Sequence, residues 1–284
     1  MVRSDVGDIS LSFGSRKVHD GSGKQEFSGV NQLANEQVFS NRTVNYIKGR
    51  PGYADGVLEL LFHDILKPND KIADVGSGTG IFAKAFIDRG FDVFCVEPND
   101  DMRTEAKKIF AGNPHFICVA ATAESTTLPE HSVDLVTAAS AFHWFDADKF
   151  HMECKRILKP NGIFFAVANG RDYNDPFTLR QHEICTEFCK DFTSLRHGLD
   201  KSIPKLEILF GSNINHAEFD FPLEYTKEKF VQRSLSSSYA PEPNTMAYQK
   251  YIVEIWALMD EFAPNSDKII VLNVSFAYWG ELSE

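Results

Sequence analysis

Short apolar runs alternate with amphipathic stretches through the middle of this chain. Runs of strand length occupy residues 71–75, 92–97, 115–119, 133–139 and 162–168, and patterns with helical spacing lie between them at 81–89, 100–111 and 147–158. Strands that alternate with helices predict an α/β fold with a parallel sheet and right-handed crossovers. In such sheets ligands bind beyond the carboxyl ends of the strands.

The chain on either side of this core follows other patterns. Residues 1–34 are rich in Gly, Ser and charge without a sustained period, and are predicted to form a flexible leader. The pattern from Asn35 to Leu66 is helical, with Pro51 at an expected helix boundary. After the core, the pattern predicts helices at 176–192, 206–210, 227–235 and 245–263, and strands at 214–221 and 268–279.

The composition narrows the class of partner. The 284 residues carry a formal net charge of -11 and no basic stripe, which argues against nucleic acid and anionic membranes and favours a small molecule. Five cysteines, an odd number within apolar segments, are typical of reduced thiols. Because no stretch reaches the length of a membrane span and no apolar signal core is present, we expect a cytoplasmic protein. Nothing in the pattern separates a monomer from a dimer.

One group of metal-ligand residue types shares a helix face. His182, Cys185 and Cys189 are three and four residues apart on a predicted helix. No fourth ligand has a suitable spacing, and Ile184 and Phe188 give the helix an apolar flank. We therefore expect buried thiols here and no metal site.

A glycine-rich turn follows the first strand of the core. Residues 73–80 read Ala-Asp-Val-Gly-Ser-Gly-Thr-Gly, and Glu97 ends the next strand. Glycines at such a turn allow close approach of a ligand to the backbone, and an acidic residue at Glu97 can accept hydrogen bonds from both hydroxyls of a ribose. The third glycine comes two residues after the second, which leaves no room for a pyrophosphate, and the lysine of a P-loop is absent. The predicted ligand has an adenosine-like end without a phosphate chain.

These residues resemble class I S-adenosylmethionine (SAM)-dependent methyltransferases of type 11. The similarity extends over motifs that occur in the family's order, namely Asp74–Gly80, Val96–Pro98, Thr122–Glu124, Leu128–Pro129, Ser132–Val136, Ala141–Asp146 and Arg156–Gly162. Within the superfamily, the Phe-His-Trp-Phe run at 142–145 and the segment from Phe39 to Tyr53 resemble a small-molecule branch that includes trans-aconitate methyltransferase.

The resemblance implies a Rossmann-like, seven-stranded, mostly parallel sheet with helices on both faces and an antiparallel last strand. Residues 214–221 and 268–279 would then pair, and residues of about 172–210 and 222–264 would form helical cap insertions over the site. We accordingly expect one domain at 35–284 with its core at 67–170. The implied cofactor is SAM, with S-adenosyl-L-homocysteine as product.

The resemblance also implies a set of cofactor-binding residues. The glycine loop and its neighbours would hold the methionine part and the sulfonium of the cofactor. The end of the second strand would bind the ribose, and a later turn would bind the adenine. The residues in this set are Asp74, Gly76, Ser77, Gly78, Glu97, Pro98, Ala123, Glu124 and Ala139. Tyr46 and Arg50 would close over the cofactor, with Arg50 able to pair with its carboxylate. Other interpretations stay open: Asp74 as a helix N-cap, Glu124 as a turn residue and Arg50 in a surface salt bridge.

Candidate residues for the acceptor follow from the same resemblance. His143 and Trp144 are predicted to position the acceptor beside the sulfonium, although a packed core histidine and a tryptophan covering the next helix are alternatives. Tyr53, Arg171, Arg233 and Tyr239 are candidate substrate-binding residues. A carboxylate acceptor needs no general base, whereas a hydroxyl or carbon acid would need one, for which His143 is the candidate.

The sequence therefore predicts an enzyme that methylates a small molecule, with a carboxylate or amine as the favoured acceptor. Two other classes stay open. One is a SAM-binding sensor or scaffold without turnover, against which the intact loop, acidic residue and aromatics argue. The other is a methyltransferase for a protein; a nucleic-acid substrate is disfavoured by the acidic balance and by the lack of an Asn-Pro-Pro-Tyr-like motif.

Overall fold

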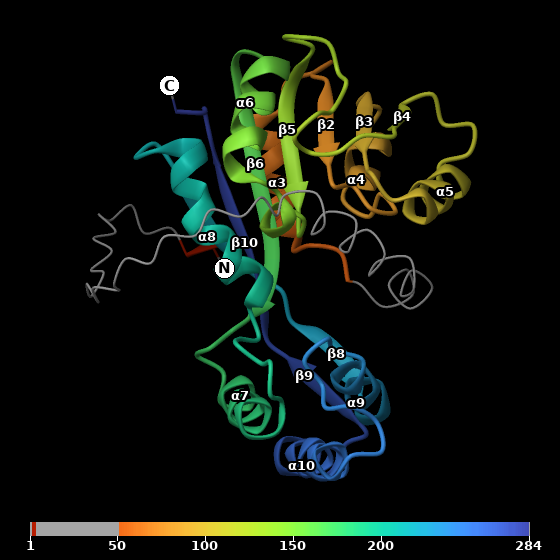
Figure 1. Ribbon diagram of the computed structural model, residues 1–284, viewed down its shortest axis with the longest axis vertical. Coiled ribbons are helices and arrows are strands. Elements are labelled where there is room, and N and C mark those ends of the chain that lie inside the picture. Colours follow the sequence, from red (N-terminus) through yellow and green to blue (C-terminus); the bar gives the residue numbers. More distant parts are fainter. Residues whose placement is uncertain (1, 4–50, 284) are drawn as a thin grey trace, which may run out of the picture.

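The computed structural model describes residues 2–3 and 51–283. Its main sheet has the strand order β1-β7-β10-β6-β5-β2-β3-β4 (Figure 1). The strands are β1 (Val2–Arg3), β2 (Ile72–Val75), β3 (Val93–Val96), β4 (Phe116–Val119), β5 (Val133–Ala139), β6 (Leu158–Arg171), β7 (Asn215–Asp220) and β10 (Asn273–Gly280). Strands β2 to β6 are parallel, and β10 lies antiparallel between β6 and β7. Apart from the two-residue β1, this is the predicted seven-stranded sheet with its antiparallel last strand, so the predicted fold class is confirmed.

Helices cover both faces of this sheet. One face packs on α3 (Asp55–Glu59), the helical segment η1 (Leu60–Ile65), α4 (Ala83–Ile87) and α5 (Asp100–Ile109). The other packs on α6 (Ala147–Ile157) and α8 (His197–Phe210). Because both faces are covered, all residues of the central strand β2 are buried, including the carboxylate of Asp74.

A second lobe lies below the carboxyl ends of the strands (Figure 1). It consists of α7 (Pro176–Phe188), α9 (Lys227–Leu235), α10 (Met246–Phe262) and a two-stranded antiparallel sheet of β8 (Leu223–Thr226) and β9 (Lys268–Val271). This cap lobe has its own apolar core, in which Phe230, Tyr251 and Ile255 are fully buried. The lobe contains parts of the two segments predicted as cap insertions together with β9, which was predicted as part of a strand, whereas α8 lies within the predicted insertion 172–210 but packs on the sheet.

Three elements differ from the sequence prediction. The expected strand 268–279 is divided at Leu272, because β9 leaves the main sheet to pair with β8, a strand that the pattern did not predict. Helix α8 begins at His197 and not at 206, although Gly198 and Pro204 are weak helix formers. The buried spacing of Leu199, Ser202, Leu206, Leu209 and Phe210 shows that packing stabilises this helix.

Some predictions lie outside the described residues. They are the predicted leader, apart from residues 2–3 in β1, and the helical pattern from residue 35 to residue 50. From residue 51 the chain is described, and it is irregular up to the start of α3. Within the described part of the chain, no helix is long and apolar enough to cross a membrane.

Phe210 is one of the residues through which helix α8 packs on the sheet. Its ring stacks on Phe164 of β6 with the ring centroids 5.5 Å apart, and it is 1% exposed. We predict that Phe210→Ala lowers the free energy of unfolding by about 3–5 kcal/mol, as expected for loss of a buried aromatic side chain. Chemical denaturation measures the change. Ile208→Ala, at a 37% exposed position of the same helix, is the control and should cost much less; equal losses would contradict this account of α8.

Candidate functional site

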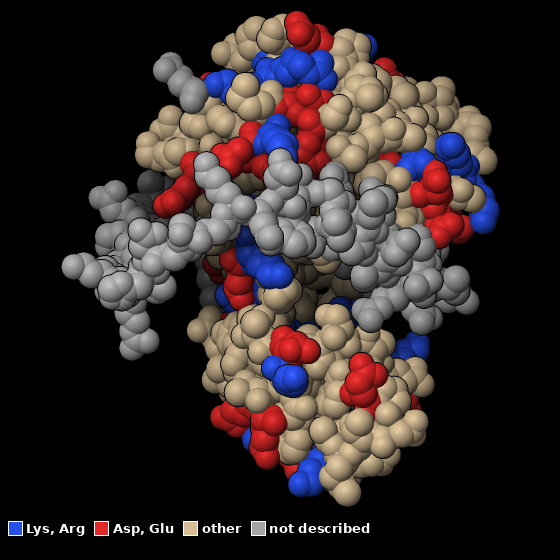
Figure 2. Space-filling model, in the orientation of Figure 1, with Lys and Arg blue, Asp and Glu red and all other residues tan. Residues whose placement is uncertain are grey.

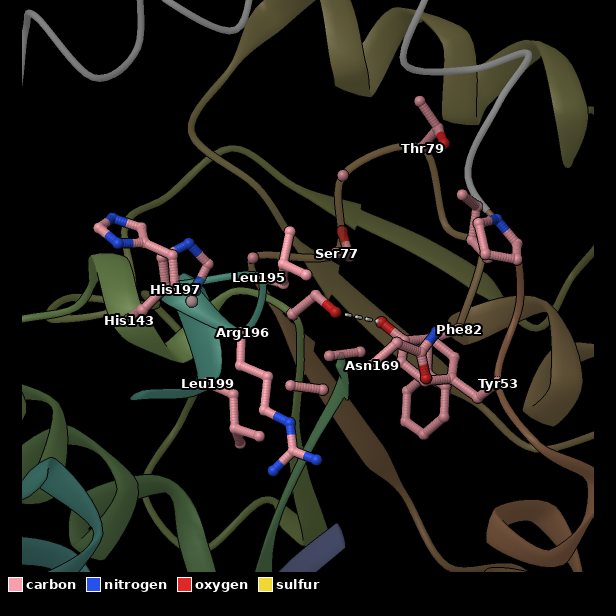
Figure 3. A pocket seen from close by; sticks show the side chains of 18 of the residues that line it. Tyr53, Ser77, Thr79, Phe82, His143, Asn169, Leu195, Arg196, His197 and Leu199 are labelled. Atoms are coloured by element: carbon pink, nitrogen blue, oxygen red, sulfur yellow. Dashed lines mark hydrogen bonds between the residues drawn. The ribbon is translucent and has the colours of Figure 1, made fainter. Parts of the chain in front are cut away.

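A cavity of about 310 Å³ lies between the sheet and the cap lobe, at the carboxyl ends of β2, β5 and β6 (Figure 3). On the sheet side it is lined by the glycine turn and by the residues that follow β5. On the opposite side it is lined by residues 194–199, which include the first turn of α8, and by residues of α9 and the loop after it. This is the edge of the sheet at which the strand pattern predicts a ligand.

The glycine turn folds tightly against the segment after β5. Gly76 has φ +69°, and a Cβ at this position would lie 2.6 Å from the Cβ of Ala141 and 3.1 Å from the ring of Phe145. Gly78 has φ +57° but open space around it, so its backbone is accessible from the cavity. Glycine is thus required at 76 by contact and conformation, and at 78 by conformation alone.

Glu97 fastens the turn to the end of β3. One oxygen of its carboxylate accepts a hydrogen bond from the Gly78 amide at 2.9 Å, and the other accepts one from the Asn99 amide at 2.9 Å. Asn99 in turn caps α5 by accepting from the Met102 amide. A carboxylate has further acceptor positions beyond these two bonds. Glu97 lies behind the turn and is 9% exposed, so it supports the wall of the cavity without lining it.

Asp74 lines the cavity beneath the turn and is almost completely buried. Its Oδ1 accepts a hydrogen bond from the Thr137 hydroxyl at 2.8 Å, whereas Oδ2 has no hydrogen-bond partner among the described residues. Burial raises the pKa of Asp74 to about 7, and the nearby Glu97 charge contributes to the increase. An acceptor oxygen at this place suits a ligand group that is cationic or donates hydrogen bonds.

The segment after β5 connects the turn to the acceptor side. Ser140 has φ +53° and accepts a hydrogen bond from the Tyr53 hydroxyl at 3.0 Å, shown as the dashed line in Figure 3. His143 lines the cavity from the short helix η2 (Phe142–Trp144). Trp144 is 45% exposed and does not line the cavity. Phe145 is buried beneath Gly76.

Helix α8 holds η2 in place from the other side. The Lys205 ammonium donates to the backbone carbonyls of His143 at 2.9 Å and of Phe145 at 2.6 Å. At Gly198, a Cβ would lie 3.2 Å from the imidazole ring of His143. The position of His143 is therefore set jointly by η2 and α8.

Arg196 lines the cavity, with its guanidinium close to two aromatic rings (Figure 3). Its Nε donates to the backbone carbonyl of Arg171 at 2.6 Å, and its guanidinium lies 5.0 Å from the ring centre of Tyr173 and 4.6 Å from that of Phe276. Rings on two sides restrict the guanidinium through cation–π contacts. Sequence reasoning missed Arg196 and the rest of the 194–199 wall, because this stretch belongs to no motif and its helix was predicted to begin later.

The structure gathers most of the predicted residues. Those that line the cavity are Tyr53, Asp74, Gly76, Ser77, Gly78, Ala139, His143, Arg233 and Tyr239. Those that do not line it are Glu97, Pro98, Ala123, Glu124, Trp144 and Arg171. Tyr46 and Arg50 lie outside the described residues.

Two of the residues that do not line the cavity have structural roles. Glu124 accepts a hydrogen bond from the backbone amide of Asp146 at 3.0 Å, where α6 begins, which is consistent with the turn-residue alternative. Ala123 is buried in the core on the α6 side of the sheet. In the described part of the chain, no group of three or more His, Cys, Asp or Glu side chains could hold a metal ion.

Known proteins match this chain over its core. Residues 73–166 match the family model of the type 11 methyltransferase domain. An uncharacterized methyltransferase of Mycobacterium tuberculosis is 32% identical over 134 residues, which are 47% of this chain and 53% of that protein. An uncharacterized methyltransferase-like protein of Schizosaccharomyces pombe is 31% identical over 160 residues, 56% of this chain and 61% of that protein. The chain thus spans little more than half the length of these curated relatives.

The fold also matches solved structures. A proposed type II methyltransferase from Anaeromyxobacter dehalogenans has a TM-score of 0.59 at 20% identity, covering 82% of this chain and 98% of that chain. At this identity the likeness concerns the fold alone.

The contrast between the two glycines gives a first prediction. Gly76→Ala combines a left-handed backbone with a steric clash, whereas Gly78→Ala meets only the conformational cost of about 1–2 kcal/mol. We expect Gly76→Ala to lower the free energy of unfolding by clearly more than Gly78→Ala, measured by chemical denaturation. Equal losses in the free energy of unfolding would mean that the clash with Ala141 is relieved by a small shift of the backbone and adds no cost.

The buried Asp74 predicts a pH dependence of stability. Because its pKa is about 7 in the folded protein and about 3.9 in the unfolded chain, the folded state binds the proton more tightly. The stabilisation is complete below about pH 4 and is lost as the pH rises toward 7, by at most about 1.4 kcal/mol per pH unit. In Asp74→Asn the free energy of unfolding should fall less between pH 5 and pH 8 than it does in the wild type. Asp88→Asn, at a half-exposed position paired with Lys84, should leave the slope unchanged; an identical slope in the wild type and Asp74→Asn would refute the assignment.

Proposed function

We propose that this chain, whose residues 73–166 form a class I SAM-dependent methyltransferase domain of type 11, is an enzyme that methylates a carboxylate of a small molecule. The observation that carries the choice of acceptor is the restrained guanidinium of Arg196 on the cavity wall opposite the glycine turn. A guanidinium binds a carboxylate with two parallel hydrogen bonds, which fixes the orientation of the bound group.

The cofactor side of the cavity fits SAM. The open backbone at Gly78 permits close approach of the methionine part, and Asp74 presents an acceptor oxygen toward a cationic amino group. Glu97 lies at the end of β3, where the ribose is expected, and a carboxylate can accept several hydrogen bonds. SAM supplies a methyl group on a positively charged sulfur, which makes that carbon electrophilic.

The residues of this chain then have to align the acceptor with the methyl group and to exclude water from the cavity. Arg196 would hold the carboxylate with one of its oxygens in line with the methyl carbon that SAM would supply; the new oxygen–carbon bond would form as the carbon–sulfur bond breaks, with the electron pair of that bond passing to sulfur. No proton is transferred, so no general base is required. Tyr53 and Ser140 hold each other at the edge of the cavity, where they restrict the approach of the acceptor. Alignment of this kind corresponds to effective molarities of about 10⁵–10⁸ M.

The roles inferred from the resemblance are part of the same proposal. His143 positions the acceptor from η2, and Tyr53, Arg233 and Tyr239 line the acceptor side. Arg171 lies behind the cavity wall and acts on the acceptor only through its charge. Trp144 supports His143, and the centres of their two rings are 4.9 Å apart. The resemblance to the branch that includes trans-aconitate methyltransferase makes unsaturated and saturated small acids the first acceptors to test.

The surface charge accords with a small acceptor. On the face shown in Figure 2, Lys and Arg side chains are scattered among Asp and Glu and form no continuous stripe. Together with a net charge of -11, this distribution disfavours a nucleic-acid substrate.

Transfer from methyl-labelled SAM to a panel of small carboxylic acids, including trans-aconitate, tests the proposed activity. The expected product releases its label as methanol in mild alkali, because it is a methyl ester. A base-stable product would move the acceptor atom to nitrogen, carbon or a hydroxyl. Bound SAM without any labelled product would favour a sensor, and label in added protein would favour a protein methyltransferase.

The ribose assignment gives a prediction of its own. Glu97→Ala removes a charged acceptor and also releases the amides of Gly78 and Asn99. A charge-assisted hydrogen bond contributes about 1.5–3 kcal/mol, so the SAM affinity of Glu97→Ala should be at least tenfold lower than that of the wild type. Glu97→Gln keeps one acceptor oxygen, and its SAM affinity should lie between those of the wild type and Glu97→Ala. Titration calorimetry measures the affinity, and circular dichroism checks the fold. Unchanged affinity in a folded Glu97→Ala protein would remove Glu97 from the cofactor site.

A further inference from the structure

The segment that carries Arg196 onto the cavity wall has an irregular backbone. Residues 189–196 connect α7 to α8, and Ser194, Leu195 and Arg196 at the end of this connection line the cavity (Figure 3). The regular hydrogen bonds of a helix or sheet do not extend over this segment, so contacts made by side chains help to hold it in place. Several of these contacts come from Tyr173, in the connection between β6 and α7.

The hydroxyl of Tyr173 is the centre of a small hydrogen-bond network. It accepts from the backbone amide of Leu195 at 3.0 Å, and it lies 2.9 Å from Nδ1 of His182 on α7 and 3.3 Å from the hydroxyl of Ser194. A phenolic hydroxyl has one proton and two acceptor positions, and all three are used when His182 accepts the proton and Ser194 donates. The Ser194 oxygen in turn accepts from the Arg196 amide at 2.8 Å. The network thus links α7 of the cap lobe to the backbone of the cavity wall.

The ring of Tyr173 lies beside the guanidinium of the same wall. The guanidinium of Arg196 is 5.0 Å from the centre of this ring and 4.6 Å from that of Phe276 on β10. The stem of Arg196 passes close to β6, where a Cβ at Gly170 would lie 3.0 Å from its Cγ, and its Nε donates to the Arg171 carbonyl. Among these contacts, Tyr173 alone lies outside the main sheet, and it alone touches both the side chain of Arg196 and the backbone before it.

Tyr173 reaches a bound molecule only through this wall. It is half-buried and does not itself line the cavity. An arginine side chain has many rotamers, and restricting it before a ligand arrives reduces the entropy that is lost on binding. A guanidinium also binds a carboxylate with paired hydrogen bonds only when its plane is correctly oriented.

We propose that Tyr173 is a positioning residue that holds Arg196 in the orientation in which it receives the acceptor. The hydroxyl acts on the backbone through Leu195, the ring acts on the guanidinium, and His182 fixes the hydroxyl from α7. The inference rests on the proposed function, in which Arg196 binds the acceptor, and it adds a residue that never touches the acceptor.

Two variants separate the hydroxyl from the ring. Tyr173→Phe removes the hydroxyl and keeps the ring, whereas Tyr173→Leu removes both. Hydrogen exchange at the Leu195 amide, measured by NMR on the full chain, should be about 3–10-fold faster in both variants, as expected for loss of one hydrogen bond. The Nε proton of Arg196, identified by its absence in Arg196→Lys, should exchange faster in Tyr173→Leu than in Tyr173→Phe.

Controls show whether the effect is local. The Cys189 amide, which donates to the Cys185 carbonyl at 2.9 Å at the end of α7, should keep its exchange rate in both variants. Tyr248→Phe, at another half-buried tyrosine of the cap lobe, should change neither Leu195 nor Arg196. Unchanged exchange at Leu195 and Arg196 in the Tyr173 variants would overturn the inference, and so would equal acceleration at Cys189, because the whole connection would then have loosened.

Kinetics measures the consequence for the acceptor. With the acid that is methylated best in the labelled-SAM assay, the KM for the acid should rise about 3–10-fold in Tyr173→Phe and further in Tyr173→Leu, while the affinity for SAM stays within about twofold of the wild type. His182→Asn, which keeps a polar group near the place of Nδ1, should retain a KM closer to the wild type than His182→Leu does.

The two measurements separate this inference from the proposed function. If the wild type methylates an acid and the Tyr173 variants keep its KM, the proposed function stands and the positioning role is overturned. If exchange at Leu195 and Arg196 responds as expected in a protein that methylates no acid, the proposed reaction is refuted, and Tyr173 is retained as the residue that positions Arg196.

Discussion

The contact of the Gly76 backbone with Ala141 and Phe145 is the constraint on which the site depends. It joins the turn after β2 to the segment after β5, and a single methyl group at Gly76 would separate them. Phe145 connects this contact to the acceptor wall, because its carbonyl and that of His143 both accept hydrogen bonds from Lys205 of α8. Arg196 immediately precedes that same helix, whose first residues also line the cavity. The glycine turn and the wall that contains Arg196 are thus joined through the ring of Phe145 and the side chain of Lys205.

The architecture explains why a cavity exists at this place. The sheet and the cap lobe each have a separate apolar core, and the cavity lies between these cores, lined by both polar and apolar residues. Strand β6 continues beyond the other parallel strands, and β9 and β10 pass from one lobe to the other with only Leu272 between them. The lobes are therefore linked by extended backbone, on which Arg171 and Asn273 meet in a buried hydrogen bond.

Charge is distributed unequally across this cavity. Buried carboxylates, Asp74 and Glu97, belong to the sheet side, and guanidinium groups belong to the cap side. A ligand that is cationic at one end and an acceptor that is anionic would each meet the opposite charge.

The sequence by itself determined the parallel core, the glycine turn and the position of Glu97 beside it, because these depend on residues close together in the chain and on a repeating pattern. It also placed α9 at the correct residues, since a capping threonine and a polar helical pattern are local signals. Only the tertiary structure decided the cap side. The start of α8, the departure of β9 from the sheet and the placement of Arg196 between Tyr173 and Phe276 depend on contacts between distant segments. Such contacts leave no periodic signal in a single sequence, because the energy that stabilises them comes from packing between elements and not from the propensities of neighbouring residues.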